Sequence, residues 1–184
     1  MKHILHLSIC ITIILTGCSR KDAIPDNTQK IHDQLHGKYK AISSTSKDAV
    51  DVNLDGTEST DLISEIPALT QSYSNLEIRI LNKDHFLLGE SWPVQYLGYG
   101  TVPDVNYANQ GVDRLFTLAA NSNKMLVKPD TDYIPDPDKF PFPTSVTIEG
   151  PDLIKIVTDR KIYTSKGWIT TTITTVYKRF TMET

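Results

Sequence analysis

The chain has 184 residues, with 19 basic and 22 acidic side chains and a formal net charge of −3 at neutral pH. Proteins that hold nucleic acid through its phosphates depend on an excess of basic residues, so this balance argues against a nucleic-acid partner. The length fits one domain with a buried core. Cys10 and Cys18 are the only cysteines, which leaves little material for disulfides or cysteine metal sites.

The first residues have the layout of a bacterial export signal. Lys2 precedes an apolar run over 4–15, which closes in the sequence Leu-Thr-Gly-Cys at 15–18. That sequence matches a lipobox, at which a lipoprotein is cleaved and acylated on its cysteine, here Cys18. A membrane-spanning helix would need about 20 apolar residues, more than this run has. An ordinary secretory signal with an incidental cysteine is the alternative.

These features predict three segments: a signal peptide over 1–17, a lipidated flexible tether over 18–33 and a β domain over 34–184. The protein is then expected in the cell envelope, held to the membrane by the lipid on Cys18. Ser19 after the cysteine fits the outer membrane better than an inner-membrane retention signal would. Cleavage also removes Cys10, which leaves no free thiol for chemistry.

From residue 36 onward the sequence is typical of β structure. Short helices are predicted at 29–35 and 61–66, the second ended by Pro67. Runs rich in β-branched and aromatic residues predict strands at 38–43, 76–82, 85–88, 94–99, 114–120, 125–128, 145–149, 153–158 and 168–180. The segments 153–163 and 168–180 are expected to form a long terminal hairpin. Threonines on both faces of its second strand indicate either a barrel wall with a partly polar interior or an exposed edge.

Both ends of this β region resemble a known family. The segment 35–40 resembles the Gly-x-Trp opening of lipocalins, with Tyr39 where the family usually has tryptophan. The closing run 176–180 looks like the last strand of small bacterial lipocalin-like lipoproteins, in which a basic residue, here Arg179, often packs across the opening aromatic. The acidic segment 50–62 is also similar to a loop of those proteins.

The resemblance implies an all-β fold, an antiparallel lipocalin-like barrel of eight to nine strands with one or two short helices. Tyr39 and Arg179 are the expected barrel-closing pair. A β-sandwich is the alternative fold. The family implies a fold and a ligand cavity, but no defined substrate.

The acidic segment carries a possible metal site. Asp51, Asn53 and Asp55, followed by a glycine, have the spacing of the first ligands in an EF-hand calcium loop. The twelfth position, where such a loop needs a bidentate carboxylate, is Leu62, and Asp61 falls one residue short. Two interpretations stay open: a structural calcium site using Asp51, Asn53, Asp55 and Asp61, and a plain Asx-rich turn.

Two aromatic loops are candidates for contact with a ligand or a partner. One follows the strand that ends near residue 88, and the other lies in the proline-rich segment 129–143, whose prolines prevent strand pairing. Either loop also fits a strap or ordinary core aromatics. The candidate residues are Trp92, Tyr96 and Tyr99 in the first loop, and Tyr133, Phe140 and Phe142 in the second.

No motif for a nucleophile, a phosphate-binding loop or a cofactor is present, so we expect a binding protein rather than an enzyme. The leading hypothesis is a lipocalin-like carrier of a small apolar or amphipathic molecule, because a barrel of about eight strands is wide enough for one small ligand. The alternative is a structural envelope lipoprotein that contacts another protein or a glycan. No cofactor is expected apart from calcium.

Overall fold

The structure is a computed structural model that describes residues 27–100, 104–129 and 134–184. The predicted signal peptide, Cys18 and Tyr133 lie outside these ranges. Within them, no helix is both long enough and apolar enough to cross a bilayer.

The described chain is almost entirely β. Its elements in chain order are α1 (Thr28–Leu35), β1 (Gly37–Val50), β2 (Ser59–Asp61), α2 (Leu62–Glu65), the 3-10 helix η1 (Pro67–Thr70), β3 (Leu76–Asn82), β4 (His85–Glu90), β5 (Pro93–Leu97), β6 (Val105–Asn109), β7 (Val112–Leu118), β8 (Lys124–Val127), β9 (Ser145–Gly150), β10 (Leu153–Thr164) and β11 (Gly167–Thr181).

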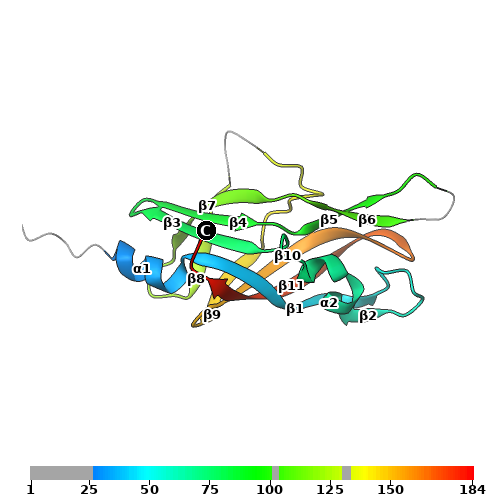
Figure 1. Ribbon diagram of the computed structural model, residues 1–184, viewed down its shortest axis with the longest axis horizontal. Helices are drawn as coiled ribbons and strands as arrows, with labels where there is room; N and C mark the ends of the chain where they lie inside the picture. The colour runs from blue at the N-terminus through cyan, green and yellow to red at the C-terminus, as the bar shows by residue number, and fades with distance from the viewer. Residues whose placement is uncertain (1–26, 101–103, 130–133) are drawn as a thin grey trace, which may run out of the picture.

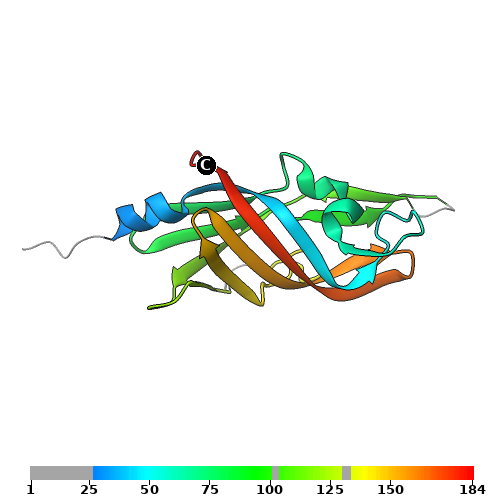
Figure 2. The same cartoon turned by 90° about the horizontal axis from the view of Figure 1, so that it is seen from below.

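Eight of the strands close into an antiparallel barrel (Figures 1 and 2). The order around it is β11-β10-β9-β8-β7-β4-β3-β1, and β1 also pairs with β11, which completes the circle. Strand β2 is an extra strand on β1, and β5 and β6 form a separate hairpin. The predicted all-β barrel is therefore confirmed, and closure excludes the β-sandwich alternative.

The seam between β1 and β11 depends on the first residues of the barrel. Gly37 has φ +136°, and a Cβ there would collide with the Thr181 carbonyl, so only glycine fits. Tyr39 and Arg179 are opposite each other in the seam. Tyr39 is fully buried, and its hydroxyl donates to the Leu35 carbonyl at 2.6 Å, which ties α1 to the barrel. Burial raises the pKa of Tyr39 to about 12.

Arg179 holds the same region together from outside the core. Its Nε donates to Asp152 Oδ1 at 2.7 Å, and its Nη1 donates to the His36 carbonyl at 3.0 Å. The guanidinium therefore joins the β9–β10 turn to the end of α1. Six residues of the predicted tether are part of α1, whose last residue, Leu35, is buried in the barrel core.

The barrel interior has three layers. The layer nearest α1, which we call the barrel core, is apolar and aromatic: Leu35, Tyr39, Leu76, Ile78, Ile80, Phe86, Leu88, Phe116, Met125, Val146, Ile154, Ile156 and Tyr177. A second apolar cluster lies toward the opposite end: Val50, Val52, Leu62, Ile66, Ala68, Leu69, Trp92, Ile162 and Ile173. Between the two lies a polar band of buried side chains: Ser44, Glu90, Arg114, Thr158, Arg160 and Thr175.

The polar band explains the threonines of the terminal hairpin. Thr171 and Thr175 of β11 are buried, and Thr175 exchanges a hydrogen bond of 2.9 Å with Ser44 of β1. The hairpin itself runs from Leu153↔Lys178 to Thr164↔Gly167, as its sequence predicts. The second strand of the hairpin is therefore part of a barrel wall with a partly polar interior, and not an exposed edge.

Candidate functional site

The barrel wall is incomplete where β10 extends beyond the end of β9. Pairing of β9 with β10 ends at Ser145↔Val157, whereas β10 continues to Thr164. The β5–β6 hairpin runs alongside this free edge but pairs only within itself. One side chain bridges the gap: the Gln95 amide accepts the Tyr163 N–H at 2.9 Å and donates to the Tyr163 carbonyl at 3.2 Å.

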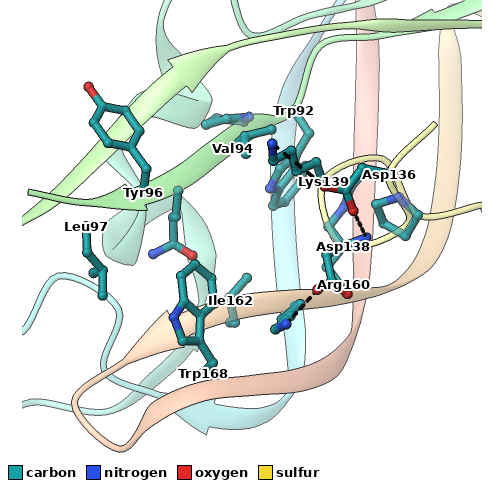
Figure 3. A pocket seen from close by; sticks show the side chains of 14 residues that line it. Trp92, Val94, Tyr96, Leu97, Asp136, Asp138, Lys139, Arg160, Ile162 and Trp168 are labelled. Atoms are coloured by element: carbon teal, nitrogen blue, oxygen red, sulfur yellow. Dashed lines mark hydrogen bonds and ion pairs between the residues drawn. The ribbon is translucent and has the colours of Figure 1, made fainter.

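A groove of about 410 Å³ fills the rest of this gap (Figure 3). Strand β5 supplies one wall, the β10–β11 hairpin supplies the other, and the segment 136–141 forms a third side. The apolar surface comes chiefly from Trp92, Val94, Tyr96, Ile162 and Trp168. Tyr96 and Trp168 are about half exposed, so their rings are open to a ligand.

The inner end of the groove is built on a buried ion pair. Arg160 Nη2 donates to Glu90 Oε1 at 2.6 Å, and both side chains are only 5% exposed. The guanidinium also lies over the Trp92 ring, 4.2 Å from its centroid, which fixes the indole at the groove wall. Tyr177 donates to the same Glu90 oxygen at 3.3 Å, and burial raises its pKa well above the usual value, so it stays a neutral phenol.

A second arginine secures the segment that closes the third side. Arg114 of β7 is buried, and its Nη2 donates to the carbonyls of Phe140 at 2.8 Å and Pro141 at 3.3 Å. Burial lowers its pKa, but an arginine stays charged at neutral pH. We call residues 134–144 the strap. Arg114 therefore holds the strap across the barrel wall from inside.

The rim of the groove is polar but nearly neutral. Lys161 pairs with Asp138 at 2.6 Å, and Lys139 pairs with Asp136 at 3.7 Å. Lys161 also lies 5.9 Å from the centroid of Trp168, a ring that meets Tyr163 edge-on. Aromatic and apolar walls with a few charged groups at the edge are typical of sites for small amphipathic molecules.

The structure separates the aromatic residues that the sequence groups together. Trp92 and Tyr96 line the groove, whereas Tyr99 is fully exposed beyond the end of β5 and does not line it. Phe140 and Phe142 lie on the strap and line a separate hollow of about 250 Å³ beside Arg114.

Trp168 is an aromatic groove residue that was not predicted from the sequence. The pairing Tyr163↔Trp168 was implied by the predicted terminal hairpin, and Trp92 and Trp168 are the only two tryptophans of the chain. Those two signals together could have pointed to it. Nothing local in the sequence, however, places β5 beside β10.

The expected ligand position inside the barrel is occupied by protein. The barrel core fills that space with large side chains, among them Tyr39, Phe86, Phe116 and Tyr177. The concave apolar surface lies instead at the incomplete wall, on the side away from α1.

The acidic segment forms the loop between β1 and β2. Asn53 Oδ1 accepts the Asp55 N–H at 2.9 Å, and Asp51 is almost fully buried. The Asp61 carboxylate instead caps α2 by accepting the Ile63 N–H at 3.0 Å. Among the described residues, no group of three or more histidine, cysteine, aspartate or glutamate side chains is arranged to hold a metal.

Comparison of the chain with protein-family models, with curated proteins and with solved structures gave no significant match.

Proposed function

We propose that this protein is a membrane-anchored, lipocalin-like lipoprotein that binds a small apolar or amphipathic molecule in the groove. The observation that carries the proposal is the pair of tryptophan rings, Trp92 and Trp168, on facing walls of a hollow of about 410 Å³. Clefts of about 300–1,000 Å³ with apolar walls and few polar groups are the usual sites of small ligands.

The walls and the rim of the groove offer different contacts to a ligand. Ile162, Val94 and the indole rings offer apolar surface, and burying it drives binding. The rim lysines are already neutralised by Asp136 and Asp138, so they favour hydrogen bonds over capture of a strongly charged group. These features support an uncharged or weakly polar amphipathic ligand.

The position of the groove suits a protein anchored through its N-terminus. Helix α1 lies at one end of the long axis, and the β5–β6 hairpin and the tip of β10–β11 lie at the other (Figures 1 and 2). If the chain is anchored through Cys18, which precedes α1, the groove lies at the end of the domain opposite the anchored end.

Native mass spectrometry of the chain from Ser19 onward, purified from a bacterial envelope without added ligand, tests the binding proposal. We expect a defined small-molecule adduct that is lost on denaturation and that Trp168→Ala reduces by about tenfold, since burying a large apolar side chain against a ligand contributes about 1.5–3 kcal/mol. Phe180→Ala is the matched control, because Phe180 is an equally exposed aromatic of β11 outside the groove. A bare mass, or equal loss in both variants, counts against a groove ligand.

Lipid anchoring is tested separately by Cys18→Ser. The unsubstituted protein is expected in the membrane fraction with the added mass of its acyl chains, because several buried chains hold a protein stably. The variant is expected to lose that mass and leave the membrane fraction. Membrane retention of an unmodified variant would exclude Cys18 as the anchor.

The free edge of β10 favours partner binding as a second candidate function. In the described residues, no strand pairs with 158–162 on the side that faces the groove. Such an edge offers main-chain groups to an extended segment of another protein, and the nearby aromatic rings offer pockets for its side chains. In the native spectra, a peptide or protein adduct that Trp168→Ala weakens would favour this candidate over a small molecule.

A further inference from the structure

Two buried carboxylates near the β1–β2 loop have no counter-charge. Asp51 and Glu65 are each 3% exposed, and within the described ranges neither forms an ion pair. Glu90 is buried to a similar degree, but Arg160 neutralises it. An ionised carboxylate is costly to bury unless a cation or hydrogen-bond donors balance it. The loop is therefore a place where a positive charge is missing.

One oxygen of Asp51 also lacks any hydrogen-bond partner. Its Oδ2 accepts the Gly56 N–H at 3.2 Å, which turns the carboxylate toward the inside of the 51–56 loop. Its Oδ1 is buried and unpartnered among the described residues. Glu65 differs, because its Oε2 accepts the Val52 N–H at 2.8 Å. Asp51 Oδ1 is therefore the oxygen that lacks a partner, and either a hydrogen-bond donor or a cation could satisfy it.

The other side chains at EF-hand positions are held by hydrogen bonds within the loop, including one from Asn53 Nδ2 to Asp55 Oδ2 at 3.0 Å. Asn53 Oδ1 and Asp55 Oδ1 each accept the N–H two residues ahead, from Asp55 and Thr57, at 2.9 and 2.8 Å. Gly56 at the sixth position has φ +87°, which glycine adopts without strain. EF-hand loops use side chains at positions 1, 3 and 5, a main-chain carbonyl at 7 and a glycine at 6.

We propose that this loop binds one calcium ion through Asp51, Asn53, Asp55 and the main-chain carbonyl of Thr57. All four ligands are oxygens, which suits a hard cation, and the irregular loop suits calcium better than magnesium, which demands a near-ideal octahedron. The twelfth position is Leu62, which is fully buried and supplies no ligand. The affinity therefore belongs to the weak class of extracellular modules, with Kd of about 10⁻⁴–10⁻³ M.

The ion would also stabilise the tip of the terminal hairpin. The Asp51 carbonyl accepts the Ser165 N–H at 2.9 Å, and Glu58 pairs with Lys166 at 2.5 Å. Both contacts join the loop to the β10–β11 turn, two or three residues before Trp168. Calcium would therefore hold in place one wall of the groove, although its binding does not depend on a groove ligand.

Calorimetric titration with calcium chloride tests the site, using the full-length protein in a non-ionic detergent after treatment with a chelator. We expect saturable binding of one ion per chain and a rise in Tm in calcium relative to chelator. Asp55→Ala is expected to lower the affinity at least about tenfold and to abolish the rise in Tm. Asp55 is exposed, so this variant should fold, and circular dichroism in chelator checks that it does.

The matched control is Asp48→Asn, which removes one exposed carboxylate of β1 three residues before the site. Its calcium affinity should stay within about twofold of the unsubstituted protein. No heat and no change in Tm at about 10 mM calcium, ten times the weakest Kd of this class, would overturn the proposal. Equal binding by the folded Asp55→Ala variant, or an equal response to magnesium, would overturn it as well.

Discussion

The two ends of the barrel interior solve the packing problem differently. Near α1, the barrel core is closed by complete strand pairing and filled by apolar and aromatic side chains. Toward the groove, strand pairing is incomplete, and the interior carries the Glu90–Arg160 pair and the strap-binding Arg114. The first end therefore supplies stability, while at the second end charged contacts replace regular strand pairing and hold loops around a hollow.

The largest loss of stability should come from breaking the Glu90–Arg160 ion pair at the groove end. Glu90→Ala leaves Arg160 buried without its partner, and losing one member of a buried ion pair costs about 3–5 kcal/mol. It also removes the acceptor of the Tyr177 hydroxyl. Denaturant unfolding monitored by circular dichroism measures the loss.

The matched control replaces both partners, Glu90→Leu together with Arg160→Leu. With neither Glu90 nor Arg160 left buried without its partner, this double variant should lose much less stability than Glu90→Ala. A double variant as unstable as the single one would show that the ion pair itself, and not an orphaned charge, holds this end together.

A smaller change of opposite sign is expected within the polar band. Thr158 is buried, and its hydroxyl has no partner among the described residues. Thr158→Val keeps the shape and removes the unsatisfied group, so we expect a gain of roughly 1 kcal/mol in the free energy of unfolding. A loss in the same denaturant experiment would mean that the hydroxyl binds ordered water.

A substitution in the barrel core should lower the free energy of unfolding by the amount usual for a well-packed interior. Ile156→Val removes one methylene from a residue that is 2% exposed, and such changes cost about 0.5–1.5 kcal/mol. The groove should be untouched, so native mass spectra of this variant should show the adduct of the unsubstituted protein. Loss of the adduct in a correctly folded variant would show that packing in the barrel core and binding in the groove are not independent.

The smallest effect concerns pH at the α1 end. His36 Nδ1 accepts the Ile80 N–H at 3.1 Å, and burial, followed by the nearby His32, lowers the pKa of His36 below its usual 6.5. The folded state therefore takes up this proton less readily than the unfolded state. The contribution of His36 to stability is full above about pH 6.5 and is lost as the pH falls through its folded pKa.

We expect this loss to shift Tm by only a few degrees between pH 7.5 and pH 5, because the ring is partly exposed and solvent screens it. His36→Asn keeps an acceptor that does not titrate, so the Tm of the variant should fall less over the same range. Identical dependence of Tm on pH in the two proteins would show that His36 does not contribute to the loss of stability at low pH.

The strands that could be predicted are those whose own side chains alternate. Leu76–Asn82 was predicted with the observed bounds, because apolar and polar residues take turns along it. Strand β2 was missed, since Ser59–Asp61 is polar throughout and is a strand only because β1 pairs with it. The second half of β1 was missed for a related reason: Ser44 and Ser46 face inward although they are polar.

The candidate site was harder to predict, because it depends on distant pairings. Glu90 and Arg160 are 70 residues apart, and neither belongs to a motif. Gln95 looks like an ordinary polar residue of a strand until β5 lies beside the free edge of β10. The loop of Asp51 was recognisable from its spacing, since all its proposed ligands are within seven residues.

The placement of both tryptophans gives the protein a built-in optical reporter. Trp92 and Trp168 account for all the indole of the chain, and each lies near a cation, Arg160 at 4.2 Å and Lys161 at 5.9 Å. Emission excited at the red edge of the protein absorption band therefore comes from the groove alone. Any occupant that displaces water or shifts those cations would change its colour and intensity, so occupancy could be followed without a label.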